Sequence, residues 1–147
     1  MAILEFPREC IEYGNIKLHS GWRSNAKYDV EKAMNNTLWK TWIVGHIPFS
    51  LHYVGIETGG ALMAKAAYEE FPTELSIVRN GKLIKGRKPI RPYLLIDDAT
   101  TTESSLLEAI NAIGSMPEKI FVAMDRRIWK RLKLTPIFRP EPAFLLF

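Results

Sequence analysis

The sequence has little cysteine, no long apolar run and no repeated or low-complexity segment. Its one cysteine, Cys10, cannot form an internal disulfide, which argues against the disulfide-stapled class of small secreted domains. No stretch of about 18 or more apolar residues occurs, so no transmembrane helix is expected. The first residues, MAILEFPREC, lack the basic-then-apolar pattern of a signal peptide. We therefore expect a cytoplasmic protein that makes no membrane contact.

The composition suits one domain with a basic surface. Of the 147 residues, 47% are hydrophobic, which suffices for one well-filled core, and we expect a single domain over residues 1–147. The formal net charge is +4, with basic residues gathered in 79–91 and 126–133. Such a charge is typical of an ordinary basic surface, of a site for an anionic ligand, or of a nucleic-acid-binding face. RNA is kept as a partner that the charge allows but does not favour.

From about residue 50 onward, strand patterns alternate with helix patterns. This alternation predicts βαβ units, and hence an α/β fold with a central, mostly parallel sheet flanked by helices. Residues 93–96 are apolar throughout, as in a strand that is buried on both faces. Ligands bind such sheets at the carboxyl ends of the strands. The predicted strands are 51–56, 75–78, 93–96 and 119–124, and the predicted helices are 61–70, 104–113 and 126–132.

Shorter elements are predicted toward the two ends of the chain and at one turn. Residues 31–44 read as a helix with Met34, Leu38 and Trp42 on one face. Asn80-Gly81 favours a two-residue hairpin turn. The remaining predicted pieces are β-type segments at 16–18 and 28–30, a hairpin arm at 82–85 and a closing strand at 143–147.

The segment richest in chemistry is Asp97-Asp98-Ala99-Thr100-Thr101-Thr102-Glu103-Ser104-Ser105. Two acidic residues end an apolar strand, and a hydroxyl-rich turn then leads into a helix. Backbone N–H groups at a helix start bind anions, and hydroxyl groups add donors, so the turn suits a phosphate. The carboxylates before it suit the hydroxyls of a sugar. An acidic strand end with ordinary N-capping by Thr102 or Ser104 explains the same residues equally well.

Two further segments are weaker indications of a site. Gly55-Ile56-Glu57-Thr58-Gly59-Gly60 lies between a predicted strand and a predicted helix. Its glycines allow backbone N–H groups to approach a phosphate, and they equally allow a helix to pack closely on a sheet. Residues 17–29 follow neither the helical nor the strand period, and by themselves they indicate a polar surface hairpin.

Taken together, these segments resemble the type I phosphoribosyltransferases, and within them the orotate phosphoribosyltransferase family. The family's Asp-Asp-x-x-Thr-Thr-Gly-Gly-Ser motif for 5-phosphoribosyl 1-diphosphate (PRPP) is similar to residues 97–105. Its Gly-x-x-Thr-Gly-Gly pyrophosphate loop matches 55–60, and its Leu-x-Ser-Gly-x-x-Ser-x-x-Tyr-x-Asp stretch is similar to 18–29. Val78-Arg79, residues 81–86 and Asp125-Arg126 follow in the family's order.

The resemblance implies a type I phosphoribosyltransferase fold, with about residues 1–30 forming a small hood, and it implies roles for particular residues. Asp97, Asp98 and Arg79 would be catalytic, with the two carboxylates reaching the ribose hydroxyls in part through Mg²⁺ carried by PRPP. The 5′-phosphate would lie on Thr101, Thr102, Glu103, Ser104 and Ser105. Pyrophosphate would lie on Glu57, Thr58, Gly59, Gly60, Arg79 and Lys82. The base would lie under Ser20, Gly21, Ser24 and Tyr28.

The implied reaction joins orotate, or another base, to PRPP and releases pyrophosphate. A non-catalytic PRPP- or nucleotide-binding descendant and an RNA-binding regulator remain the alternatives. The family usually assembles as homodimers, and the apolar residues 143–147 need cover, so a homodimer is expected.

Three departures from the family pattern bear on the chemistry. Only Asn80 separates Arg79 from Gly81, where the family has a mobile loop with lysines and a histidine. Glu103 and Ser104 replace the two glycines of the phosphate turn, and Glu57 replaces a proline. A carboxylate beside a phosphate is repulsive by roughly 1 kcal/mol even in a water-like dielectric, so we expect the charge of Glu103 to weaken PRPP binding. The alternative is that Glu103 points away from the phosphate and favours the helix N-terminus instead.

Overall fold

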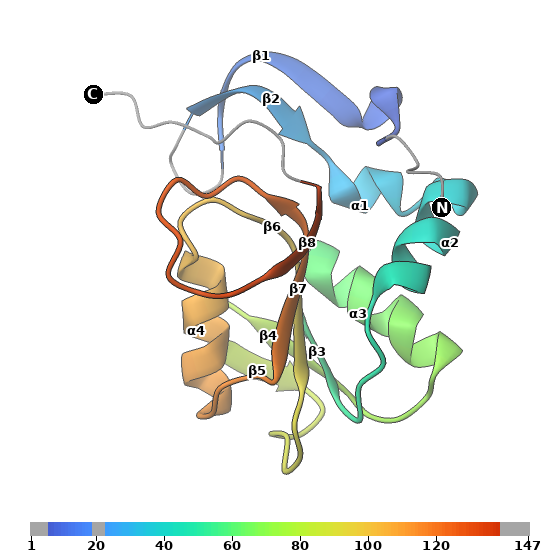
Figure 1. Cartoon of the computed structure of the whole chain (residues 1–147), viewed down its shortest axis with the longest axis vertical. Helices are drawn as coiled ribbons and strands as arrows, with labels where there is room; N and C mark the ends of the chain where they lie inside the picture. The colour runs from blue at the N-terminus through green and yellow to red at the C-terminus, as the bar shows by residue number, and fades with distance from the viewer. Residues whose placement is uncertain (1–5, 19–22, 139–147) are drawn as a thin grey trace.

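A computed structural model describes residues 6–18 and 23–138 (Figure 1). A six-stranded sheet forms its centre, and a separate two-stranded hairpin lies near the N-terminus. In chain order, the elements are a 3₁₀ turn Arg8–Cys10, β1 Ile11–Lys17, β2 Arg23–Tyr28, α1 Val30–Ala33, α2 Thr37–His46, β3 Tyr53–Ile56, α3 Gly59–Glu70, β4 Leu75–Arg79, β5 Lys82–Lys85, β6 Leu94–Thr100, α4 Ser104–Ile113, β7 Lys119–Asp125 and β8 Thr135–Phe138.

The large sheet has the strand order β5-β4-β3-β6-β7-β8. Every neighbouring pair is parallel except β4–β5, which is antiparallel. β6 lies in the middle, between β3 and β7. The predicted α/β class with a mostly parallel central sheet is therefore confirmed.

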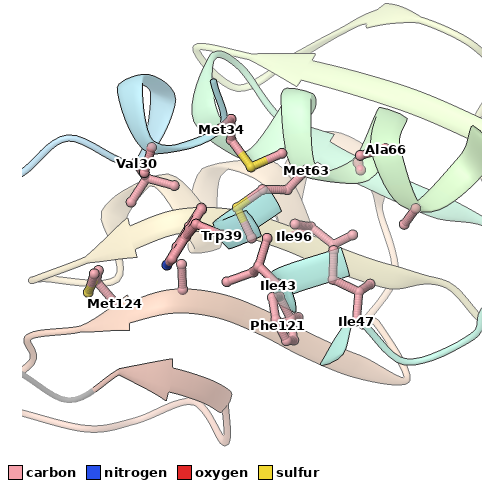
Figure 2. Packing of buried hydrophobic residues seen from close by; sticks show 14 of the residues in the cluster. Val30, Met34, Trp39, Ile43, Ile47, Met63, Ala66, Ile96, Phe121 and Met124 are labelled. Carbon is pink, nitrogen blue, oxygen red and sulfur yellow. The ribbon is translucent and has the colours of Figure 1, made fainter. Parts of the chain in front are cut away.

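Helices cover both faces of this sheet. Successive residues of a strand point to opposite sides, so each face presents apolar side chains for helices to pack against. Leu94 and Ile96 face a cluster that includes α2 and α3, while Leu95 faces α4. Figure 2 shows part of the first cluster, where Trp39 and Ile43 from α2 lie near Phe121, Ile96 and Met63. The hairpin β1–β2 joins this side through edge-to-face contacts of Phe6, whose ring centroid lies 5.3 Å from that of Trp39 and 5.5 Å from that of Tyr28.

The predicted turn at Asn80-Gly81 is confirmed. Both residues have positive φ, 48° and 72°, as a two-residue hairpin turn between twisted strands requires. β4 and β5 pair directly across it, with Arg79 opposite Lys82. The predicted hairpin arm at 82–85 has the bounds of β5.

The predicted helix over 31–44 is wrong, because two helices occupy this region. α1 ends at Ala33, and the side chain of Asn36 starts α2 by accepting a hydrogen bond from Trp39 N at 3.0 Å. This cap resets the helical phase. Trp39 and Ile43 are consequently the buried residues of α2, and Leu38, predicted for the buried face, is 75% exposed.

Of the two elements predicted near the C-terminus, the helix is wrong and the strand is not tested. Residues 126–132 were predicted as a helix, but they form an irregular segment between β7 and β8. β8 was not predicted; it contains Pro136, which an edge strand of the described sheet tolerates. The predicted strand at 143–147 lies outside the described residues. Within 6–18 and 23–138, no helix combines the length and apolarity needed to cross a bilayer.

Replacing Trp39 by alanine should lower the free energy of unfolding by about 3–5 kcal/mol, since its side chain is fully buried in the cluster between α2 and the sheet. The neighbouring substitution Leu38→Ala is the control and should change it by less than about 0.5 kcal/mol. Urea unfolding followed by circular dichroism measures both. Equal losses for the two variants would contradict the observed phase of α2.

Candidate functional site

The predicted site segments lie together at the carboxyl ends of the parallel strands, along one edge of the sheet. Residues 57–60 follow β3, 80–82 follow β4, and 101–105 follow β6. Backbone hydrogen bonds join these segments to neighbouring strands: Glu57 N donates to Val78 O and Arg126 N donates to Thr100 O, both at 2.9 Å. The position agrees with the general placement of ligands in α/β sheets.

In the segment 57–60, the two glycines allow the start of α3 to pack closely against β6. A Cβ added to Gly59 would lie 2.6 Å from Cβ and Cγ of Asp98, and one added to Gly60 would lie 2.8 Å from Cα of Asp97 and closer still to the carbonyl of Ile96. Glu57 and Thr58 are exposed, their peptide bond is cis, and the Thr58 side chain makes no capping hydrogen bond. The glycines therefore bring the start of α3 against the two aspartates.

Asp97 and Asp98 lie within β6, which continues beyond the predicted strand end to Thr100. Asp97 is buried and accepts a hydrogen bond from Asp98 N at 2.8 Å, while Asp98 accepts one from Ala99 N at 2.8 Å. Burial raises the pKa of Asp97 well above its usual value, and the charge of Asp98 raises that pKa further. The neutral form of Asp97 is thus favoured in the folded chain, and ionising it as the pH rises costs stability.

A third carboxyl group, Glu31 of α1, belongs to this electrostatic environment and was missed in the sequence. Burial raises its pKa, and the charges of Asp98 and then Asp29 raise it further. No sequence pattern links Glu31 to Asp98, because only the packing of α1 near β6 joins them. In the part of the chain that the structure describes, no three such side chains are arranged to hold a metal ion by themselves.

Hydroxyl groups define the turn between β6 and α4. Thr100 Oγ1 accepts a hydrogen bond from Glu103 N at 3.2 Å, and the hydroxyls of Thr102 and Ser104 lie 2.8 Å apart. Thr101 and Thr102 are partly exposed, and Ser104 and Ser105 are exposed at the first turn of α4. Helix N-termini of this kind attract anions.

The side chain of Glu103 does not face this turn. Glu103 has φ of 69°, in the left-handed region that glycine adopts freely and other residues adopt at a cost of roughly 1–2 kcal/mol. It is 1% exposed, and its carboxylate forms an ion pair with Arg127 at 2.7 Å. Of the two orientations that the sequence left open for Glu103, the structure therefore has the one that points away from the turn, with Arg127 paired to the carboxylate.

Arg79 and Lys82 flank the Asn80-Gly81 turn at the carboxyl end of β4, and both are exposed. Glu57, hydrogen-bonded to Val78, lies beside this strand end. The two cations thus lie at the end of β4, next to the strand that leads into residues 57–60.

The N-terminal hairpin, expected to form a hood, contacts Arg126, a buried residue that directly follows β7. Its Nη1 donates to Ala26 O at 2.8 Å, its Nη2 donates to Ser24 Oγ, and its guanidinium carbon lies 5.4 Å from the ring centroid of Tyr28. Ser24 and Tyr28 of the predicted base site are thus joined to the strand ends. Ser20 and Gly21 lie outside the described residues.

The sequence indicated these arginines only in part. Asp125-Arg126 was recognised as a motif, but the burial of Arg126 and Arg127 was hidden by the helix predicted for 126–132. Glu31 carried no sequence signal, because it acts on Asp98, which is distant in the chain.

Comparisons with known proteins agree with this arrangement. The orotate phosphoribosyltransferase of Methanocaldococcus jannaschii is 31% identical over an alignment of 139 residues, which spans 80% of this chain and 76% of that protein. No protein-family model matches the chain.

Solved structures share the fold. That of orotate phosphoribosyltransferase from Aeropyrum pernix has a TM-score of 0.68 at 22% identity and covers 81% of this chain and 77% of its own. The Mycobacterium tuberculosis H37Rv orotate phosphoribosyltransferase, in complex with PRPP, has a TM-score of 0.61 at 19% identity, with coverage of 76% and 74%.

Replacing Gly60 by alanine should lower the free energy of unfolding by about 1–3 kcal/mol, because the new methyl group would overlap the backbone of β6. Gly45 is the control: it lies inside α2, where an added Cβ meets nothing within 4 Å. Gly45→Ala should raise stability by up to about 1 kcal/mol through helix propensity. Thermal unfolding of both variants measures the opposite signs, and a neutral Gly60→Ala would contradict the close packing.

Proposed function

Because this chain belongs to the orotate phosphoribosyltransferase family, a branch of the type I phosphoribosyltransferases, we propose that it transfers the phosphoribosyl group of PRPP to orotate. A ring nitrogen of orotate would attack the anomeric carbon of PRPP. The new carbon–nitrogen bond replaces the carbon–oxygen bond to pyrophosphate, which leaves with the bonding electrons. The products are orotidine monophosphate and pyrophosphate.

One observation carries this proposal: the packing of Gly59 against Asp98. It brings the segment expected to hold pyrophosphate next to the carboxylates expected to hold ribose. The phosphate turn begins at the end of the same strand, β6. The three parts of PRPP, which are phosphate, ribose and pyrophosphate, therefore correspond to three adjoining parts of one sheet edge. Such chemistry depends on positioning and on stabilising the charge of the leaving group more than on proton transfer by the protein.

In this mechanism, each group has a task that its surroundings support. Asp98, and Asp97 once it is ionised, would accept hydrogen bonds from the ribose hydroxyls. The backbone at 58–60 would hold pyrophosphate, with Arg79 and Lys82 supplying positive charge from the neighbouring β4 turn. The hydroxyls of 101–105 would hold the 5′-phosphate.

A magnesium ion carried by PRPP fits the carboxyl groups of this edge. The charge of Asp98 raises the pKa of both Asp97 and Glu31, so a cation here would relieve the repulsion among them. Since no three described side chains form a metal cluster alone, oxygens of PRPP would complete the coordination. When bound, the ion would neutralise charge on pyrophosphate as it leaves.

The base would bind between the hood and the strand ends. Arg126 holds Ser24 and Ala26 at the end of β7, and its positive charge beside Tyr28 suits an anionic base such as orotate. A homodimer is proposed with it, since this family usually assembles in pairs.

A second candidate, a PRPP-binding protein without turnover, is favoured by the hairpin at Asn80-Gly81. The two-residue turn leaves no segment between β4 and β5 long enough to close over the site. Closure excludes water and brings cations to the leaving group, so its loss affects catalysis more than binding.

Asp97→Asn combined with Asp98→Asn should abolish binding of PRPP in the presence of Mg²⁺, because Asp98 loses its charge and Asp97 can no longer ionise to accept hydrogen bonds from ribose. Asp97→Asn alone should bind more strongly than the double variant, since an amide resembles the neutral carboxyl that burial already favours. Isothermal calorimetry measures the affinities, and circular dichroism checks the fold. Glu118→Gln, an exposed change before β7, is the control. Unchanged affinity in the double variant would remove the basis of the phosphoribosyl site.

Turnover should be slower than in relatives with a full loop after the Val-Arg strand, by about 10²–10³ or more, the usual cost of losing one preorganised electrostatic contact. A steady-state assay of orotidine monophosphate formation measures it. Tight PRPP binding without any product would select the second candidate. A rate equal to that of a loop-bearing relative would show that another segment closes the site.

A further inference from the structure

Glu103 occupies a position where the backbone adopts a glycine-like conformation. It is the residue before α4, with φ of 69° and ψ of 4°, and its side chain is fully buried. In the family pattern this position of the phosphate turn is a glycine. A glutamate there needs compensating contacts, and the structure supplies them on the side away from the turn's hydroxyls.

The carboxylate of Glu103 binds the irregular segment 126–132. Its Oε2 accepts hydrogen bonds from Arg127 Nη1 at 2.7 Å, from Leu132 N at 2.8 Å and from Arg131 N at 3.1 Å. Burial by itself would raise the pKa of Glu103, but these donors outweigh it and lower the pKa. The carboxylate is thus ionised and held by two backbone amides and a guanidinium.

Arg127 connects this carboxylate to the sheet. Its Nε and Nη2 donate to the two oxygens of Asp125, at 2.8 and 2.9 Å, and its Nη1 also donates to Leu132 O at 2.6 Å. Arg131, largely exposed, adds a cation 3.5 Å from Glu103. Two carboxylates thus face two guanidiniums, of which Arg127 is buried and Arg131 is largely exposed, and backbone N–H groups also donate to the carboxylate of Glu103.

We propose that Glu103 is a positioning residue for the 5′-phosphate, an inference that rests on the proposed function. Its carboxylate ties the turn at 100–104 to the end of β7 and to residues 126–132. Fixing the carboxylate fixes the turn that precedes α4, and with it the direction of the hydroxyls and N–H groups that face the phosphate. The side chain itself makes no contact with the ligand. A glycine would adopt the conformation of this turn freely. In this chain, the buried ion pair of Glu103 with Arg127 holds the turn in that conformation instead.

The substitution Glu103→Gly tests this without straining the backbone at residue 103. Glycine adopts φ of 69° without strain, and Arg127 keeps both oxygens of Asp125, so no buried charge is left without a partner. Glu103→Gln keeps the length of the side chain and removes its charge, and it serves as the conservative variant. Glu108→Gln, an exposed change on the same helix, is the matched control.

Two small probes separate the turn from the rest of the site. Ribose 5-phosphate has the group expected at 101–105, while inorganic pyrophosphate has the group expected at 58–60. Calorimetry should show ribose 5-phosphate binding weakened about tenfold or more in Glu103→Gly and less in Glu103→Gln, as misplacement of a preorganised site predicts. Pyrophosphate binding and the Glu108→Gln control should be unchanged. Hydrogen exchange should quicken at both 100–105 and 126–132 in Glu103→Gly.

Each other outcome overturns a defined part of the proposal. If Glu103→Gly binds ribose 5-phosphate as tightly as the unaltered protein, or more tightly, the carboxylate does not position the turn. Equal weakening of both probes would indicate general loosening of the fold. Unchanged exchange at 126–132 would show that the carboxylate does not hold that segment. If the unaltered protein binds neither probe, the proposed function is wrong, and this inference, which rests on it, is wrong as well.

Discussion

Two consecutive buried arginines at the end of β7 join the parts of this molecule that secondary structure leaves separate. Arg126 donates to Ser24 and Ala26 of the hood, and Arg127 donates to Asp125 and Glu103. The two side chains, which directly follow β7, bind different segments of the chain. The N-terminal hairpin, the turn before α4 and the irregular segment 126–132 are each in contact with one of this pair.

Buried charge is costly unless it is paired and hydrogen-bonded, and the two arginines meet this condition in different ways. Arg127 is matched by carboxylates, and burial of Glu103 and Asp125 is outweighed by hydrogen bonds and the guanidinium, so the pKa of each is lowered. Their contribution to stability is present above the unfolded-state pKa and is lost as the pH falls through the lowered folded-state value. Arg126 donates to Ala26 O and Ser24 Oγ and lies over the face of Tyr28.

The acidic side of the site has the opposite electrostatics. Asp97 is buried beside Asp98 without a described cation in contact, and its pKa is raised. The same sheet edge therefore holds a compensated cluster around Arg127 and an uncompensated one around Asp97. The compensated cluster ties the turn before α4 to residues 125–132, and the uncompensated one is where we propose that a ligand brings hydroxyls or a cation. This difference in charge compensation supports different roles for Glu103 and for the two aspartates, although all three lie within the seven residues 97–103.

Much of the parallel sheet could be predicted, because buried strands are continuous apolar runs and the Asn80-Gly81 turn has its own chemistry. The errors occurred where one side chain overrides a pattern. The cap at Asn36 split a predicted helix, and the contacts of Arg127 with Glu103 and Leu132 replaced another with an irregular segment. β6 ran past its predicted end because its ladder with β7 continues through polar residues to Thr100.

The sequence by itself determined the α/β class, the order of the site segments and the presence of Asp97, Asp98, Gly59 and Gly60 next to strand ends, since these follow from local pattern and from the geometry of parallel sheets. Only the tertiary structure decided where the side chains point. It turned Glu103 toward Arg127, brought Glu31 into the environment of Asp98, and placed Ser24 on Arg126. The physical reason is that each of these contacts joins residues from separate elements, so it forms only when the whole core is packed.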